Sequence, residues 1–203
     1  MQLLIATRNR GKVRELEKLL ADLPVSLRSL NDFPDVPEAE ETGATFAENA
    51  RIKASFYAER TGISALADDS GLAVEALGGA PGVLSARYAG ENASDAQRCR
   101  KLLKELNATG DEQRRARFVC AIALADARGE IKHLAEAACA GRISPLAKGA
   151  NGFGYDSIFV PEGFEQTFGE LHDEVKQKIS HRALAIKKII RYLRAFTALP
   201  LDL

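Results

Sequence analysis

Two adjacent carboxylates are the residues of this chain best suited to chemistry. Asp68 and Asp69 follow the apolar run 63–67, and Ser70 and Gly71 come directly after them. Carboxylates placed side by side repel each other, so a fold that puts them at a strand end usually holds a cation there. Successive side chains of an extended segment point to opposite faces, so one carboxylate would work in a cleft and the other would support it. An acidic turn that caps a following helix is the alternative, and this segment alone leaves both open.

A basic loop lies between the first expected strand and the helix that follows it. The loop consists of Thr7, Arg8, Asn9, Arg10, Gly11 and Lys12. Backbone N–H groups at a helix N-terminus favour anions, and a glycine allows a phosphate to approach closely. The loop is not a P-loop, because GxxxxGK[ST] lacks its first glycine here and Val13 replaces the Ser or Thr. It is either a phosphate-binding loop of another kind or an ordinary basic turn.

A second acidic cluster precedes a helix that carries two polar side chains on one face. The cluster contains Glu38, Glu40 and Glu41, while Asn49 and Lys53 are four residues apart on the helix. One of these glutamates could meet Asp69 and hold a divalent cation, since magnesium takes one or two protein carboxylates plus substrate phosphate oxygens. The alternative is a solvated loop with acidic residues favoured near a helix start.

Two later segments could bind the base of a nucleotide. The first is a glycine-rich loop, formed by Gly152, Phe153, Gly154, Tyr155 and Asp156. Aromatic side chains in a loop can plug a core or stack on a base. The second is Lys176 together with Ser180, His181 and Arg182. Ser180 is explained as a helix N-cap, whereas His181 and Arg182 could donate hydrogen bonds to a keto oxygen or a phosphate.

The elements that must position these residues indicate an α/β fold with a mixed sheet. Apolar runs predict strands at 3–7, 26–30, 117–125, 131–143 and 157–160. Helical spacing of apolar residues predicts helices at 12–23, 45–60, 95–106 and 180–196. Strands alternate with helices in the first half, and paired strands occupy the middle. The chain of 203 residues is expected to form one domain with two lobes.

Composition and charge exclude several classes of function. The 28 basic and 28 acidic side chains cancel, which argues against broad binding to nucleic acid or to an anionic membrane. The three cysteines form no CxxC pair, as expected in a reducing cytosol. The apolar N-terminus is too short for a signal peptide, and no run reaches membrane-spanning length. A soluble, cytoplasmic protein is expected.

Together these motifs identify a family resemblance that runs from Leu3 to Phe196. In chain order the motifs are Thr7-x-Asn9-x-Gly11-Lys12, Glu41-Thr42-Gly43-x-x-Phe46-x-Glu48-Asn49-Ala50-x-x-Lys53-Ala54, Ala67-Asp68-Asp69-Ser70-Gly71-Leu72, Gly78-Gly79-Ala80-Pro81-Gly82, Ser85-Ala86-Arg87-Tyr88, Gly152-Phe153-Gly154-Tyr155-Asp156 and Ser180-His181-Arg182. The chain resembles the inosine/xanthosine triphosphate pyrophosphatase family, and its bacterial branch most closely. Only the tail 197–203 lies outside the match.

The resemblance implies a magnesium-dependent hydrolase that cuts ITP, dITP or XTP to the monophosphate and pyrophosphate. It also implies a long central sheet between two lobes, with the substrate in the cleft, and a homodimer. Asp69 would be the catalytic base and a magnesium ligand, with Glu40 favoured over Glu41 as the second ligand. The loop Thr7 to Lys12, Lys53 and Ser70 would hold the triphosphate. The base and sugar would be enclosed by Phe153, Gly154, Tyr155, Asp156, Lys176, His181 and Arg182.

The chemistry of these residues agrees with that expectation. The ordinary pKa of Asp is about 3.9, so a metal that acidifies the attacking water would help Asp69 to act as a base. Water would attack the α-phosphorus and expel pyrophosphate, while Lys12 and Lys53 share the triphosphate charge. Donors from His181 and Arg182 to the purine O6 would reject 6-amino purines. Two alternatives are the septum-inhibitor type of pyrophosphatase, whose arginine-rich loop is absent here, and a nucleotide sensor without turnover.

Overall fold

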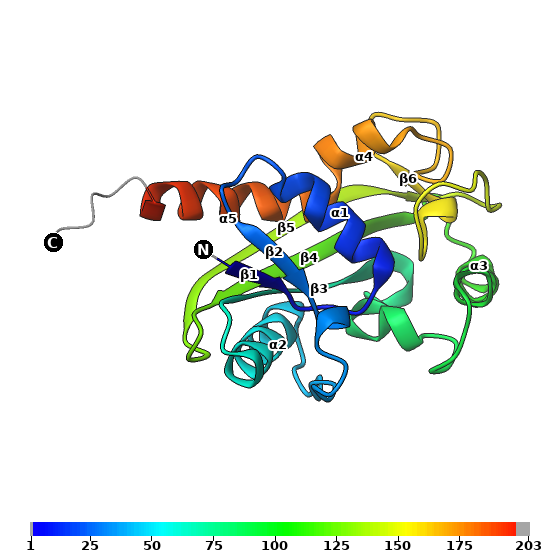
Figure 1. The fold of residues 1–203 in the computed structure, drawn as a ribbon. Helices are drawn as coiled ribbons and strands as arrows, with labels where there is room; N and C mark the ends of the chain where they lie inside the picture. The colour runs from blue at the N-terminus through cyan, green and yellow to red at the C-terminus, as the bar shows by residue number, and fades with distance from the viewer. Residues whose placement is uncertain (1, 198–203) are drawn as a thin grey trace, which may run out of the picture. The chain divides into compact units, whose positions relative to one another are not determined.

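The computed structural model describes residues 2–197 and contains one mixed six-stranded sheet (Figure 1). The strands are β1 (Gln2–Ile5), β2 (Ser26–Ser29), β3 (Ala65–Val74), β4 (Arg115–Ala125), β5 (Ile131–Ile143) and β6 (Phe159–Pro161). Their order is β2-β1-β3-β4-β5-β6, with β1 parallel to both neighbours and β5 antiparallel to β6. The predicted α/β class with a mixed sheet is therefore confirmed.

Five α-helices accompany the sheet in the described part of the chain. They are α1 (Arg10–Leu20), α2 (Phe46–Thr61), α3 (Asp95–Thr109), α4 (Asp173–Ile179) and α5 (His181–Thr197). The helix α1 begins at Arg10, earlier than predicted, because the Asn9 side chain caps it. The short helix α4 was not predicted, since seven residues are too few to show helical spacing clearly. Of the expected tail, 198–203 lie outside the described residues.

The largest departure from the sequence prediction is the path of β3. This strand continues through Asp68, Asp69, Ser70 and Gly71 to Val74, so these residues lie inside a strand rather than at its end. The prediction that the strand ends at these carboxylates is therefore wrong, and so is the alternative of an acidic turn that caps a helix. Polar residues are tolerated in mid-strand here because buried cations meet both carboxylates.

The chain divides into two units, each with its own core. Unit 1 comprises residues 2–69, 120–137 and 182–197 of the described chain, and unit 2 comprises 70–119 and 138–181. In unit 1, α1 and α5 cover one face of the strands and α2 covers the other (Figure 1). The strands β3, β4 and β5 each contribute residues to both units.

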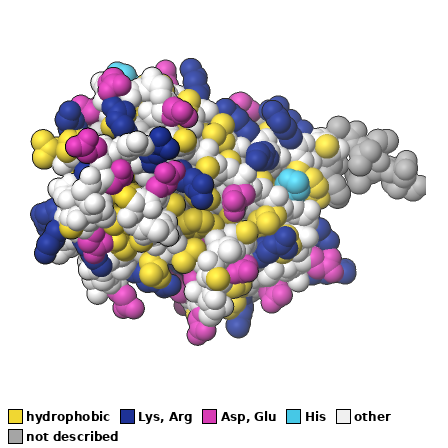
Figure 2. Space-filling model, turned by 180° about the vertical axis from the view of Figure 1, so that it is seen from behind, with side chains coloured by type: hydrophobic (Ala, Val, Ile, Leu, Met, Phe, Trp, Pro, Cys, Tyr) yellow, Lys and Arg dark blue, Asp and Glu magenta, His cyan; other side chains and the backbone are white. Residues whose placement is uncertain are grey.

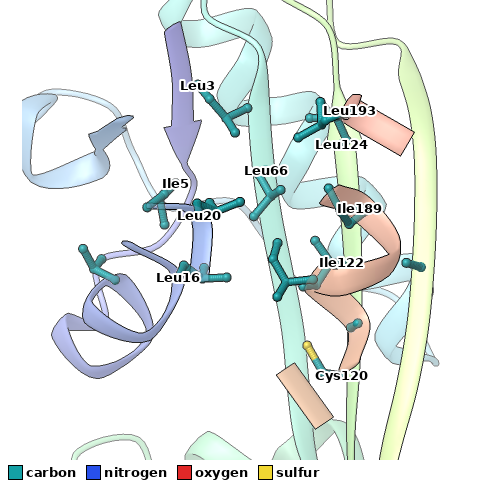
Figure 3. Packing of buried hydrophobic residues seen from close by; sticks show 14 residues of the cluster. Leu3, Ile5, Leu16, Leu20, Leu66, Cys120, Ile122, Leu124, Ile189 and Leu193 are labelled. Atoms are coloured by element: carbon teal, nitrogen blue, oxygen red, sulfur yellow. The ribbon is translucent and has the colours of Figure 1, made fainter. Parts of the chain in front are cut away.

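The two faces of the unit 1 strands are packed differently. Large aliphatic side chains fill the face under α1 and α5, where Leu3, Leu66 and Ile122 meet Leu16 and Ile189 (Figure 3). Alanines fill the opposite face, where they pack against α2. These alanines are Ala65, Ala67, Ala121 and Ala123 on the strands and Ala50, Ala54 and Ala58 on the helix. Small side chains bring α2 close to β3, which allows short contacts between their polar residues.

Unit 2 is built around aromatic rings. The ring centroids of Phe118 and Phe159 are 4.5 Å apart, and the Phe168 ring packs against both rings. Leu72 of β3 and Leu102 of α3 belong to the same buried cluster. The core therefore anchors both α3 and the segments around β6 that carry the predicted base-binding residues.

The surface agrees with a chain of zero net charge. On the face drawn in Figure 2, basic and acidic side chains are interspersed rather than gathered in a patch of one sign. Among the described residues, no helix has both the length and the apolar character needed to cross a bilayer.

Candidate active site

Asp69 lies at the centre of a polar cluster built by β3 and α2. The Lys53 Nζ is 2.7 Å from Asp69 Oδ1 and 2.9 Å from Glu41 Oε1. One turn earlier on α2, the Asn49 Nδ2 donates to Asp69 Oδ2 at 3.4 Å. The Asn49 side chain also accepts a hydrogen bond from the Gly43 backbone, which holds the segment before α2 in place. The predicted shared face of Asn49 and Lys53 is confirmed, because both contact one carboxylate.

Burial and charge act in opposite directions on this cluster. Burial raises the pKa of Asp69, and the nearby Lys53 ammonium offsets only part of that rise. Burial opposes the charged form of Lys53, but Asp69, Asp68 and Glu41 outweigh it and raise the pKa of Lys53. Lys53 therefore stays protonated, and Asp69 is a stronger base than an exposed aspartate. Perturbed pKa values of this kind cluster at functional sites.

The donor set at Asp69 fits a divalent cation that is shared with a substrate. Asp69 and Glu41 together carry one negative charge more than Lys53 neutralises, and both supply hard oxygen donors. Within residues 2–197, no group of three or more His, Cys, Asp or Glu side chains could by itself hold a metal ion. Two carboxylates plus phosphate oxygens match the way in which proteins bind magnesium, rather than an all-protein cage.

The structure brings Glu41, rather than Glu40, to this cluster. The Glu40 side chain is exposed and makes no polar contact with the described residues, whereas Glu41 is half-buried against Lys53. The sequence prediction preferred Glu40 as the second ligand. Glu41, rather than Glu40, shares the Lys53 ammonium with Asp69, and which glutamate binds a metal ion stays a prediction.

Asp68 points to the opposite face of β3, as the alternation of strand side chains predicts. Its Oδ2 accepts hydrogen bonds from Arg182 Nε at 3.1 Å and Nη2 at 3.0 Å, and its Oδ1 lies 3.2 Å from Lys12 Nζ. Glu15 of α1 forms a further ion pair with Arg182. Burial alone would raise the pKa of Asp68, but Lys12, Arg182 and Lys53 outweigh it and hold that pKa far below the ordinary value. Asp68 therefore remains ionised and ties α1 and α5 to β3.

Arg182 is placed differently from the expectation that it faces a purine. Its side chain is almost fully buried and bound to Asp68 and Glu15. Contact with a base stays a prediction, and it would require the guanidinium to leave two carboxylates. The Glu15 contact was missed by the sequence analysis, although the three-residue spacing from Lys12 places both side chains on one face of α1.

The basic loop before α1 is ordered by its own side chains. The Asn9 Oδ1 accepts hydrogen bonds from Gly11 N at 2.9 Å and Lys12 N at 3.1 Å, and Thr7 Oγ1 accepts one from Asn9 N. Arg8 donates to the backbone oxygens of Leu30 and Val36, so it anchors the segment after β2. Arg10 is exposed. Of the three basic side chains, that of Lys12 forms the ion pair with the buried Asp68 carboxylate.

A second polar cluster lies in unit 2, at the glycine-rich loop. The Asp156 Oδ2 accepts from Phe153 N at 2.8 Å and from Lys176 Nζ at 2.5 Å, and this Nζ lies 4.8 Å from the centre of the Phe153 ring. A Cβ on Gly152 would lie 2.0 Å from Asp156 Oδ2, so glycine is required there. The loop therefore presents one aromatic ring, one ammonium and one carboxylate as a group.

Two other residues expected in the base pocket have structural partners. Tyr155 is buried, and its hydroxyl donates to the Ser85 backbone oxygen at 2.9 Å. The His181 ring is also buried and stacks on Phe118 at 4.7 Å. Ser70, next to Asp69 in β3, is half-buried. Direct contact of these residues with a nucleotide stays a prediction.

Comparisons with known proteins place this chain among its relatives. It is 50% identical over 188 residues to a dITP/XTP pyrophosphatase of Geobacillus kaustophilus, which covers 93% of this chain and 92% of the relative. Solved structures of Ham1 proteins from Coxiella burnetii and Staphylococcus aureus match with TM-scores of 0.87 and 0.83 at 42% and 40% identity. Each covers 96% of this chain and 99% of the solved chain.

A family model agrees with these pairwise matches. The Ham1 family model matches residues 3–192, nearly the range over which the motifs follow one another in order. The family resemblance read from the motifs is confirmed, and the chain belongs to the Ham1 family.

Proposed function

We propose that this chain is a magnesium-dependent pyrophosphatase that hydrolyses ITP, dITP and XTP to the nucleoside monophosphate and pyrophosphate. The names of its relatives, dITP/XTP pyrophosphatases, support this activity. The single observation that carries the proposal is the buried Asp69, whose pKa is raised and which shares the Lys53 ammonium with Glu41. This arrangement joins a base, a cation and a second carboxylate in one place.

In the proposed reaction, Asp69 accepts a proton from the water that attacks the α-phosphorus, and pyrophosphate leaves. Lys53 and Lys12 offset the negative charge of the triphosphate, and Ser70 and the loop from Thr7 to Gly11 contribute hydrogen-bond donors. Asp69 and Glu41, with Glu40 as the alternative, would hold a magnesium ion that acidifies the water and neutralises phosphate charge. Asp68 keeps Lys12 in place through the ion pair at 3.2 Å.

We propose that the unit 2 cluster recognises the base. The Phe153 ring offers a stacking surface, and the Lys176 ammonium beside it offers a donor to a purine keto oxygen. His181 and Arg182 are the further candidate donors, while Gly154, Tyr155 and Asp156 shape the loop that carries Phe153. A 6-amino group would leave such donors unpaired, and this loss can discriminate between substrates by ~10⁴.

A nucleotide panel tests this function directly. Pyrophosphate release is measured from ITP, dITP, XTP, ATP and GTP, each with and without magnesium. We expect fast, magnesium-dependent release from ITP, dITP and XTP and slow release from ATP and GTP. Equal rates on ATP, or orthophosphate as the first product, would contradict the proposal.

The variant Asp69→Asn separates a hydrolase from a nucleotide sensor without turnover. It keeps the size of the side chain and removes the basic oxygen, so nucleotide binding should persist. Single-turnover cleavage of ITP should fall by about 10³-fold. Unchanged cleavage would remove Asp69 from the mechanism. A wild-type protein that cleaves pyrimidine nucleoside triphosphates faster than ITP would favour the septum-inhibitor type.

We also propose a homodimer, as the family resemblance implies. Sedimentation equilibrium at micromolar protein concentration tests this directly. A mass equal to one chain of 22.0 kDa would contradict it.

A further inference from the structure

Both backbone polar groups of Gly154 are bound by one face of α3. The Gly154 N–H donates to Asp95 Oδ2 at 2.6 Å, and the Cys99 thiol donates to the Gly154 oxygen, with Sγ 3.4 Å away. Asp95 and Cys99 are four residues apart, so they lie one above the other on the helix. Burial raises the pKa of the Cys99 thiol, which therefore keeps its proton and can donate. All of these residues belong to unit 2.

Asp95 also connects this loop to a second segment of unit 2. Its Oδ1 pairs with Arg98, whose Nη1 donates to the backbone oxygens of Ala86 at 2.9 Å and Ala93 at 2.6 Å. The loop 152–156 and the segment 86–93 are thus both held by neighbouring side chains at the start of α3. Asp95 contacts both the loop, through Gly154, and Arg98, the side chain that binds the segment 86–93.

The glycine-rich loop depends on hydrogen bonds from outside the loop to fix its backbone conformation. Gly152 and Gly154 have φ values of +75° and +65°, and glycine residues lose more conformational freedom on ordering than any other residue. A Cβ on Gly154 would meet nothing within 4 Å, so neighbouring atoms do not confine this residue sterically. Its two hydrogen bonds to α3 therefore fix the peptide groups on both sides of the Gly154 Cα, the first of which directly follows Phe153.

We propose that Asp95, assisted by Cys99, is a positioning residue for base selection. Asp95 does not itself touch the nucleotide. It holds Gly154 so that the Phe153 ring and the Lys176 ammonium keep their 4.8 Å arrangement in the free protein. The inference rests on the proposed function, because the role of this loop at the base is part of that proposal.

The experiment compares Asp95→Ala with two matched variants. Asp95→Ala removes the acceptor, and Asp95→Asn keeps an acceptor oxygen at the same place. Gln97→Ala is the helix control, because the Gln97 side chain accepts from Ser94 N at 2.7 Å in the cap of α3 and does not contact Gly154. Steady-state kinetics on ITP and ATP, and hydrogen exchange of the loop 152–156, are measured for each protein.

We expect Asp95→Ala to lower kcat/KM for ITP by about tenfold, with kcat changed less than about twofold. The ratio of kcat/KM for ITP over ATP should fall, because a misplaced donor to the purine O6 no longer rejects a 6-amino group, and exchange in the loop should accelerate. Asp95→Asn should restore both the substrate ratio and the loop exchange to near the wild-type values. Gln97→Ala should leave both as in the wild type. Cys99→Ala should change the substrate ratio and the loop exchange in the same direction but by less. This variant tests the inference if Asp95→Ala does not fold.

Two results would overturn the inference while the proposed function stands. In one, the wild type prefers ITP, but Asp95→Ala and Cys99→Ala leave the ITP/ATP ratio unchanged. In the other, Gln97→Ala lowers the ratio as much as Asp95→Ala, so that helix stability alone explains the effect. A wild-type protein that releases no pyrophosphate from ITP would overturn the proposed function, and base selection with it.

Discussion

At the scale of single residues, Lys53 is the group that links the two carboxylates of the polar cluster at Asp69. Its ammonium lies within 2.9 Å of carboxylate oxygens from both Glu41 and Asp69, which approach from different parts of the chain. A divalent ion placed between these carboxylates would compete with Lys53 for the same oxygens.

The identity of the second metal ligand can be tested by neutralising each glutamate separately. Glu41→Gln should raise the magnesium concentration needed for half-maximal activity by about tenfold or more, because Glu41 already shares a cation with Asp69. Glu40→Gln, the matched control, should leave the magnesium requirement unchanged. Magnesium titrations of pyrophosphate release give the answer, and the opposite pattern would restore Glu40 as the ligand.

A different residue-scale prediction concerns the buried pair of Asp68 and Arg182. Arg182→Met should lower the free energy of unfolding by about 3–5 kcal/mol, because it leaves Asp68 buried beside fewer cations. The double variant Asp68→Asn/Arg182→Met should lose less unfolding free energy than the two single variants lose together. Urea denaturation of the four proteins measures this coupling. Strict additivity would show that the pair does not act as a unit.

At the scale of elements, α2 is the helix that assembles the site. Its alanine face lets it lie close to β3, and Asn49 and Lys53 then reach Asp69 from the same surface. The start of α2 is a capping box, in which Thr45 Oγ1 accepts from Glu48 N at 3.1 Å and the Glu48 carboxylate accepts from Thr45 N at 3.2 Å. The cap orders the segment that leads from Glu41 into the helix.

The cap of α2 can be removed without touching the polar cluster. Thr45→Ala should lower the free energy of unfolding by about 1 kcal/mol, because the Glu48 N–H loses its acceptor. Thr45→Ser keeps the hydroxyl and should remain close to the wild type. Thermal unfolding reports the difference, and equal melting temperatures for Thr45→Ala and Thr45→Ser would refute it.

At the scale of the whole molecule, each unit buries its own core, and all three cysteines lie in these cores. Cys120 belongs to unit 1, whereas Cys99 and Cys139 belong to unit 2. Burial raises the pKa of all three thiols, that of Cys139 to about 11. The cores thus protect every thiol of the protein from reaction.

This protection predicts how the thiols respond to pH. A raised pKa means less thiolate at any given pH, so alkylation of the native protein should begin at higher pH than alkylation of the unfolded chain. At pH 8, iodoacetamide should modify the native protein at least about tenfold more slowly than the protein in urea. Mass spectrometry identifies each modified cysteine. Rapid native labelling of Cys99 would contradict its burial against Gly154.

The sequence by itself determined most of the elements and the family. Apolar spacing depends on local backbone geometry, so the α/β order and the boundaries of β5 follow from it. The paired polar residues Asn49 and Lys53 were also predictable, because one turn of helix fixes their relation.

Only the tertiary structure decided how the charges combine. Asp68 and Arg182 are 114 residues apart, and no local period relates them. The choice of Glu41 over Glu40 at Lys53 likewise depends on the path of the segment before α2. The passage of β3 through Asp68 and Asp69 was missed for the same reason, since isolated carboxylates would end a buried strand. They continue it here because distant parts of the chain, α1, α2 and α5, bring Lys12, Lys53 and Arg182 to meet them.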